Sequence, residues 1–117
     1  MEKVRKVIAY KQYFSDFYNI QSKQVKEKII WTLKILELEK IIPSRFFRHI
    51  KDTDGIYEVR VEIESNIFRI FAFFDKENII VISNGFQKKT QKTPRKEIEK
   101  AIKIMEEYKN EKKTNNS

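Results

Sequence analysis

The fold is decided by residues 55–92, which read GIYEVRVEIESNIFRIFAFFDKENIIVISNGFQKKTQK. Three runs in this stretch are rich in Val, Ile, Phe and Tyr, and Ser, Asn, Asp and Gly stand at the breaks between them. Runs of β-branched and aromatic residues bounded by turn formers are typical of strands joined by tight loops. The stretch therefore predicts three consecutive strands, over residues 57–64, 67–74 and 79–86.

The first of these strands alternates strictly between apolar and charged residues, which predicts one buried and one polar face. If residues 65–66 form a two-residue hairpin loop, Arg60, Glu62 and Arg69 share the polar face. In this register Arg60 and Arg69 are diagonal neighbours, close enough to share one ligand. A slip by one residue would bury both arginines, which favours the register chosen. The predicted core face holds Tyr57, Val59, Val61, Ile63, Phe68, Ile70, Ala72 and Phe74.

The third strand extends the sheet toward a cationic segment. If residues 75–78 form a four-residue loop, Ile79 and Val81 join the core face. The strand then continues into residues 87–92, so this segment starts where the two arginines already point. The residues predicted on the arginine face are Ile80, Ile82, Asn84 and Phe86.

The flanking segments predict one more strand and two or three helices. Residues 4–14 favour a first strand, and Ser15 and Asp16 are suited to cap the helix that follows. This helical segment runs to about Lys40, either unbroken or interrupted near residues 21–22, and Pro43 ends it. Its predicted buried stripe is Val25, Ile29, Thr32, Leu33 and Leu36, widened by Trp31, Ile35 and Leu38.

The C-terminal part predicts a last helix and a tail. Residues 44–54 are expected to form a connection that includes a helical turn. Thr93 and Pro94 are typical of a helix start, with Thr as the N-cap and Pro at the first helical position. A single domain over residues 1–108 and a polar tail over 109–117 follow from this. The order is β-α(α)-β-β-β-α, an α+β domain whose mostly antiparallel sheet packs against helices.

The composition favours a basic globular protein with a polyanionic partner. The 117 residues carry a net charge of +8, with 40% hydrophobic and 36% charged residues. RNA or DNA is the first partner to consider and an acidic protein the second, although surface lysines also simply keep a protein soluble. A charged N-terminus without an apolar leader, and short apolar runs, predict a cytoplasmic protein with no membrane contact.

Several kinds of chemistry are not expected from this sequence. The chain has no cysteine and a single histidine, His49, so neither thiolate chemistry nor a histidine metal site is predicted. Two glycines cannot form a Gly-rich phosphate loop. We therefore expect no metal and no cofactor, and an enzyme of this composition would work with Arg, Lys, Tyr, His and carboxylates.

The strand arginines admit two interpretations from the pattern alone. Arg69 can form a cross-strand ion pair with Glu62, which contributes little to stability if it is exposed. Alternatively, two guanidinium groups on an otherwise apolar face can clamp a phosphate. Phe86 suits either stacking on an unpaired base or packing beneath a helix.

Four motifs follow one another in order: IYEVR at residues 56–60, FR at 68–69, GFQKK at 85–89 and PRKEIEKA at 94–101. Together they resemble the RelE/ParE superfamily of bacterial toxins, most closely its HigB-like, or phage Gp49-like, branch. The resemblance implies the toxin of a type II toxin–antitoxin pair, a ribosome-dependent endoribonuclease that cuts mRNA. It also implies a cognate antitoxin, usually of the helix-turn-helix type, which would neutralise the toxin and bind the operator DNA.

The resemblance further implies a site without metal, in which the RNA 2′-hydroxyl is the nucleophile. Arg69 would stabilise the phosphorane with Arg60 beside it, and Lys88 and Lys89 would hold the phosphate or assist proton transfer. Phe86 would position a base. Lys92, from the basic run, and Lys51 and His49, just upstream of the sheet, are further candidates for contact with RNA, although the pattern favours a structural or solvent-facing role for Lys51 and His49. Tyr108 is the nearest counterpart of the proton-transfer residue of some relatives, but it lies on the predicted core stripe.

Two alternatives stay open at this point. ParE-like members of the same superfamily bind DNA gyrase and cleave nothing, so the arginines and lysines would then be interface contacts. A basic module that binds RNA or antitoxin without any activity is the other alternative.

Overall fold

The structure, a computed structural model, describes residues 2–89 and 92–115. A five-stranded mixed sheet lies at its centre, with the strand order β1-β5-β4-β3-β2. β1 runs parallel to β5, and the neighbours in the rest of the sheet are antiparallel. The predicted α+β fold with a mostly antiparallel sheet is therefore confirmed. The elements are β1 (Lys6–Ala9), α1 (Tyr13–Asn19), α2 (Lys23–Leu38), β2 (Phe47–His49), β3 (Tyr57–Ile63), β4 (Asn66–Lys76), β5 (Ile79–Lys88) and α3 (Arg95–Asn115).

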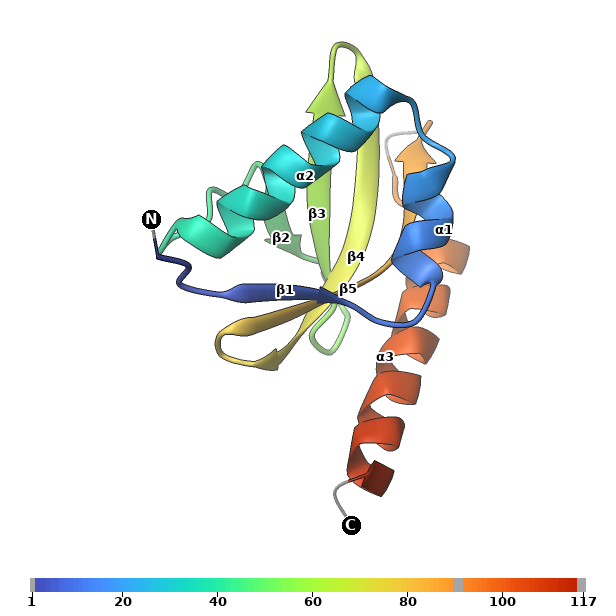
Figure 1. Cartoon of the computed structure of the whole chain (residues 1–117). Coiled ribbons are helices and arrows are strands. Elements are labelled where there is room, and N and C mark those ends of the chain that lie inside the picture. Colours follow the sequence, from blue (N-terminus) through green and yellow to red (C-terminus); the bar gives the residue numbers. More distant parts are fainter. Residues whose placement is uncertain (1, 90–91, 116–117) are drawn as a thin grey trace.

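Helices cover both faces of the sheet, which gives two separate cores (Figure 1). α1 and α2 pack on the face that carries Val59, Val61 and Ile70, and we call this the α1/α2 core. α3 packs on the opposite face, over Phe71 and Phe73, which forms the α3 core. The alternation in β3 and β4 therefore predicted correctly which of these side chains point to which face.

The β3–β4 hairpin turns one residue earlier than predicted. Its two-residue loop is 64–65 rather than 65–66, and Glu64 takes the positive φ of 54°. Moving the loop by one residue moves every cross-strand partner by two, so each side chain keeps its predicted face. Arg60 consequently lies directly opposite Arg69, and not diagonally from it.

The β4–β5 connection is also shorter than predicted. β4 ends at Lys76 and β5 begins at Ile79, so a two-residue turn replaces the expected four-residue loop at 75–78. The shorter turn by itself would keep the predicted faces, but a register shift at Asp75, between the pairs Phe74–Ile80 and Lys76–Ile79, reverses the faces at the start of β5. Ile80 and Ile82, predicted on the arginine face, lie in the α1/α2 core. Ile79 and Val81, predicted in that core, belong to the α3 core.

A β-bulge then restores the predicted faces for the rest of β5. Ser83 and Asn84 together lie opposite Phe71, and the Ser83 hydroxyl donates to the Phe71 carbonyl at 3.2 Å. An extra residue reverses the alternation of the strand that carries it. Phe86 therefore faces the α3 side as predicted, directly opposite Arg69.

A close approach beside the bulge explains the glycine at position 85. A Cβ atom there would lie 2.6 Å from Cδ2 of Phe17, a buried residue of α1. Such a distance is far below a van der Waals contact, so only glycine lets α1 pack this close to β5. α1 therefore packs directly against β5 next to the bulge, while β5 stays paired with β4 up to Lys88.

The helices before the sheet begin and end at other residues than predicted. α1 begins at Tyr13, so Ser15 and Asp16 lie inside the helix and do not cap it. Of the two alternatives, the segment is interrupted near residues 21–22, because Ser22 is the N-cap of α2 and its hydroxyl accepts a bond from the Val25 amide. α2 ends at Leu38, so Pro43 does not terminate it.

Two features of this region differ from the prediction in ways that affect the surface. Residues 44–54 contain a short edge strand, β2, which pairs with β3. α2 buries Ile29, Leu33 and Leu36 as predicted, but Trp31 is 46% exposed and does not join the buried stripe. This short edge strand pairs only with the first part of β3, and among the described residues no strand pairs with the outer edge of residues 61–63.

α3 starts one residue later and ends later than predicted. Its first turn is closed by the Pro94 carbonyl, which accepts from the amides of Glu97 and Ile98. The helix continues to Asn115, so the predicted polar tail is helical over 109–115, and residues 116–117 lie outside the described part. Figure 1 shows its C-terminal half extending beyond the sheet.

Asp75 fastens this half of α3 to β4. The Tyr108 hydroxyl donates to Oδ2 of Asp75 at 2.6 Å, and the Lys112 ammonium forms an ion pair with the same oxygen. These bonds lower the pKa of Asp75, that from Lys112 most and that from Tyr108 next. The carboxylate is therefore more stable in its charged form when the protein is folded.

Asp75→Asn is expected to lower the free energy of unfolding at neutral pH by about 1–3 kcal/mol, because the amide loses the charge that both donors contact. The folded pKa lies below the unfolded value of about 4, so the stabilisation is lost as the pH falls through the folded pKa. Urea unfolding of both proteins at neutral pH and at about pH 2 tests this. An equal difference at both pH values would contradict the prediction.

Candidate functional site

α3 leaves part of its face of the sheet uncovered by the helix, and cationic side chains from neighbouring strands meet there. The sheet register places Arg60 of β3, Arg69 of β4 and Phe86 of β5 in one row across three strands. Lys88, two residues after Phe86, is opposite Ile67 and faces the same side. The structure thus brings together four residues predicted to form the site.

Arg69 is almost completely buried and is paired with Glu58. The side chain of Arg69 is 6% exposed and that of Glu58 10%, and the Arg69 guanidinium donates to Oε1 of Glu58. The predicted partner Glu62 instead pairs with Arg60 at 3.1 Å, near the surface. The cross-strand ion pair expected at Arg69 therefore exists, but with a different and buried carboxylate.

Within residues 2–89 and 92–115, one polar group of this ion pair lacks a hydrogen-bond partner. The Thr93 hydroxyl donates to the other carboxylate oxygen of Glu58 at 3.4 Å. Nε of Arg69 is buried and has no acceptor among the described residues. A buried donor without an acceptor is costly, and such donors commonly serve a water or a ligand.

Arg48 completes a group that we call the cationic cluster, defined as Arg48, Glu58, Arg60, Arg69 and Lys88. Arg48 of β2 lies opposite Glu58 in the register of β2 and β3. Burial lowers the pKa of Arg69 most; Glu58 opposes this effect, and the charges of Arg60 and Arg48 add to it. Burial also lowers the pKa of Lys88 most, followed by the charge of Arg69.

Sequence reasoning missed Arg48 and instead selected its neighbour His49. The two residues are consecutive in β2, so they point to opposite faces of the sheet. His49 pairs with Tyr57 and its ring packs edge-on against the Tyr57 ring at 5.2 Å, away from the cationic cluster. His49 therefore does not join the cationic cluster, and its contact with RNA stays a prediction.

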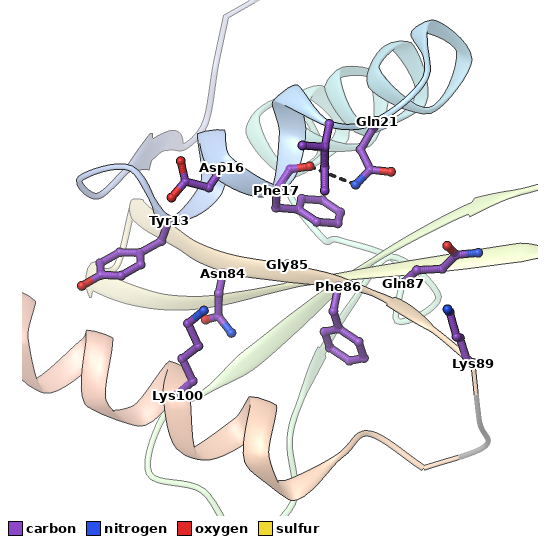
Figure 2. A pocket seen from close by; sticks show the side chains of 11 residues that line it. Tyr13, Asp16, Phe17, Gln21, Asn84, Gly85, Phe86, Gln87, Lys89 and Lys100 are labelled. Carbon is purple, nitrogen blue, oxygen red and sulfur yellow. Dashed lines mark hydrogen bonds between the residues drawn. The ribbon is translucent and has the colours of Figure 1, made fainter.

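Phe86 borders both the cationic cluster and a groove beside α1. Its ring stacks on Phe71 with the ring centres 5.6 Å apart and an angle of 23° between the planes. One side of the ring is thus packed, while the residue as a whole is only half-buried. The groove has a volume of about 510 Å³, and Figure 2 shows Lys89 and Lys100 at its border.

The remaining predicted site residues lie farther from the cluster or at its margin. Lys89 lines the groove and not the cluster, and Lys51 is exposed in the loop after β2. Lys92 is exposed at the start of the segment before α3. Thr90 and Gln91, also part of the predicted cationic segment, lie outside the described residues.

Tyr108 does not reach the cluster, as its place on the core stripe predicted. Burial and the bond to Asp75 raise its pKa to about 12, which holds it protonated. Across the described ranges, no group of three or more His, Asp or Glu side chains is arranged to hold a metal ion. In the same ranges, no helix combines the length and the apolar character needed to cross a membrane.

The charges of this arrangement are suited to binding an anion. Four cationic side chains surround one carboxylate, so the cluster keeps an excess of positive charge even though Arg69 is neutralised by Glu58. Partial burial strengthens the attraction for a phosphate because water screens it less. The aromatic ring of Phe86 lies next to these cations, as in sites that bind single-stranded nucleic acid.

The element order and the mixed sheet with helices on both faces define a RelE-like fold. The family described as Phage derived protein Gp49-like (DUF891) matches residues 16–106. The chain therefore belongs to this family, which is a family of RelE/HigB-like toxins. No curated protein matches the chain.

Proposed function

We propose that this protein is the toxin of a type II toxin–antitoxin pair and acts as a ribosome-dependent endoribonuclease on mRNA. The cationic cluster on the open sheet face, with Phe86 beside it, is the observation that supports this most. RNA offers phosphates to the cations and an unpaired base to the ring. Membership of a family of RelE/HigB-like toxins agrees with this activity.

The proposed reaction uses a nucleophile that the RNA itself carries. The 2′-hydroxyl loses its proton and its oxygen forms a bond to the adjacent phosphorus, while the bond from phosphorus to the 5′-oxygen breaks. The leaving 5′-oxygen takes up a proton. The products are a 2′,3′-cyclic phosphate and a 5′-hydroxyl, so a metal-bound water is not required by the stoichiometry.

The cations of the cluster would stabilise the charge of the phosphorane. Arg60 is half-buried, and we expect it to contact the phosphate directly together with Lys88. Arg69 would contribute its positive charge and could donate a hydrogen bond from its buried Nε, because Glu58 accepts from Nη1 of the guanidinium and not from Nε. Lys88 has a lowered pKa, so we propose it for proton transfer.

The proposed partners follow from the same assignment. We propose a cognate antitoxin, of the helix-turn-helix type, that neutralises the toxin and alone contacts the operator DNA. mRNA on the ribosome would be the substrate, which places the protein in the cytoplasm. Neither a metal nor a cofactor enters this proposal.

Induced expression of the wild-type chain in a bacterium tests the proposed function. We expect growth arrest and new mRNA 5′ ends inside translated reading frames. These ends should carry 5′-hydroxyl groups, which separates attack by the 2′-hydroxyl from hydrolysis that leaves a 5′-phosphate. The double variant Arg60→Gln/Lys88→Met should show neither arrest nor cleavage while accumulating to the same level.

Arrest with intact mRNA would overturn the nuclease assignment. Induction of a DNA-damage response in that case would indicate inhibition of DNA gyrase, as in ParE-like toxins. Absence of arrest in a chain that is folded and abundant would contradict a toxin role altogether.

A further inference from the structure

A second surface rich in aromatic and cationic side chains lies at the uncovered edge of β3. We call it the Trp31 cleft and define it by its lining residues. It has a volume of about 170 Å³ and opens to solvent. Its lining residues are Lys28, Trp31, Arg45, Phe46, Arg60 and Glu62.

Trp31 is held in place and yet accessible. Its ring packs edge-on against Phe46 with the centres 5.8 Å apart, and the residue is 46% exposed. Lys28, one helical turn earlier, places its ammonium 3.9 Å from the centre of the Trp31 ring. An ordered, solvent-facing indole with a cation beside it suits stacking with a planar partner.

Phe46 carries a second cation in the same way. The Arg45 guanidinium lies 4.7 Å from the centre of the Phe46 ring. The short strand β2 explains why this region is open. The Arg60 amide still bonds to the Phe46 carbonyl, but in the described part of the chain no strand pairs with the edge beyond it. The cleft thus gathers three cations and two aromatic rings around one carboxylate.

Arg60 connects the Trp31 cleft to the cationic cluster. It lines the cleft, and it also lies directly opposite Arg69 in the sheet. Side chains directly opposite each other in an antiparallel pair have Cβ atoms about 4.5–5.5 Å apart. A strand of nucleic acid with one phosphate at the cluster can therefore place a neighbouring base in the cleft.

We propose that the Trp31 cleft is a binding subsite for one unpaired base of a single-stranded RNA, with Lys28 and Arg45 on the flanking phosphates. This inference rests on the proposed function. It adds a second contact with an RNA base, on the opposite side of Arg60 from Phe86. The alternation of rings and cations matches the alternation of bases and phosphates in a single strand. A duplex keeps its bases stacked inside and cannot offer one to the indole.

The single tryptophan of the chain provides a direct measurement. A short single-stranded RNA with 2′-O-methyl groups, which cannot be cleaved through its 2′-oxygen, is titrated into the full-length protein. Stacking on the indole is expected to quench the Trp31 fluorescence in a saturable manner. A duplex of the same sequence should leave the fluorescence nearly unchanged.

Variants then test whether the ring itself contributes to binding. With a labelled form of the same RNA, Trp31→Ala is expected to raise Kd by about 5- to 150-fold, the range for one stacked base. Trp31→Phe should retain most of the affinity. Lys109→Ala serves as the charge control for Arg45→Ala, because Lys109 is exposed on the distal half of α3.

The outcomes separate this inference from the proposed function. Quenching by the uncleavable RNA, with loss of affinity in Trp31→Ala, supports the subsite even if the chain cleaves no mRNA. Absence of quenching, an unchanged Kd in Trp31→Ala, or equal quenching by the duplex would overturn the subsite, even if mRNA is cleaved. Equal losses in Arg45→Ala and Lys109→Ala would overturn the role given to Arg45.

Discussion

Replacing Arg69 by alanine is expected to lower the free energy of unfolding by about 3–5 kcal/mol, because it leaves the Glu58 carboxylate buried without its cation. Glu58 is 7% exposed and Arg69 5%, so water cannot replace the lost guanidinium. Thr93 would remain as a donor to Glu58, but a single hydroxyl does not compensate a buried charge. Urea unfolding of wild type and variant measures the difference directly.

A double variant distinguishes the loss of the pair from the loss of packing. In Glu58→Met/Arg69→Met both charges are gone and most of the side-chain volume is kept. Buried ion pairs replaced in this way commonly leave stability unchanged or increase it, so we expect this variant to unfold near the wild-type denaturant concentration. If Arg69→Ala unfolded at the wild-type concentration, the carboxylate would not depend on Arg69 and the prediction would be contradicted.

This result decides how an Arg69 variant is interpreted in a toxicity assay. A destabilisation of several kcal/mol is a large fraction of the stability of a domain of this size. Loss of growth arrest in Arg69→Ala would then follow from unfolding as readily as from loss of a phosphate contact. The double charge-free variant provides the missing control, because it is expected to be folded and inactive.

The sequence predicted the faces of β3 and most of β4 because side chains alternate along a strand independently of where the connecting loop begins. A loop placed one residue too late moved the partners of Arg60 and Arg69 by two positions, yet both kept their face. The extra residue at Ser83 and Asn84 was not predictable from the alternation, since a bulge has no required residue type. The register shift at Asp75 explains why Ile80 was placed on the wrong face, and the bulge in β5 cancels that shift, so Phe86 was placed correctly.

β2 is the element that sequence reasoning could not find, and its absence from the prediction affected two parts of the candidate surface. A strand of three residues is too short to show alternation, and Arg45, Arg48 and His49 look alike as part of a polar connection. Without β2 there was no means to separate Arg48, which faces the cluster, from His49, which faces away. The exposed edge of β3 and the Trp31 cleft were missed for the same reason.

Glu58 and Trp31 illustrate a second limit, which concerns burial. The alternation placed Glu58 on the face of the arginines, but only the structure shows that this carboxylate is buried beside Arg69 and that Glu62 is not. Trp31 lies next to the apolar stripe of α2, and hydrophobicity alone assigned it to the core. Departures of this kind, a buried charge and an exposed aromatic ring, are informative about binding.

Lys88→Met is expected to reduce the rate of mRNA cleavage by about 10²–10³-fold, the usual effect of removing one electrostatic contact to a transition state. Its effect on stability should be the opposite of that of Arg69→Ala. The pKa of Lys88 is lowered by burial and by the charge of Arg69, so its charged form is disfavoured in the folded protein. Removing this charge is therefore expected to leave the free energy of unfolding unchanged or to raise it.

Cleavage of a defined mRNA in a translation reaction gives the rate, and urea unfolding gives the stability of the same preparation. Arg60→Gln should lower the rate similarly and stability by no more than about 1 kcal/mol, because its pair with Glu62 is solvent-exposed. Lys109→Ala is the matched control for the loss of one positive charge. A Lys88→Met enzyme with the wild-type rate would remove Lys88 from the site.

Lys88→Arg separates the two roles that Lys88 can have. Arginine keeps the positive charge, but its pKa is too high for it to give up a proton. If Lys88 only holds the phosphate, Lys88→Arg should retain most of the rate that Lys88→Met loses. If Lys88 transfers a proton, both variants should lose the rate, and the alkaline limb of the wild-type pH profile should be absent from their residual activity. The lowered pKa of Lys88 favours the second outcome, because proton transfer near neutral pH requires a lysine whose ammonium is destabilised.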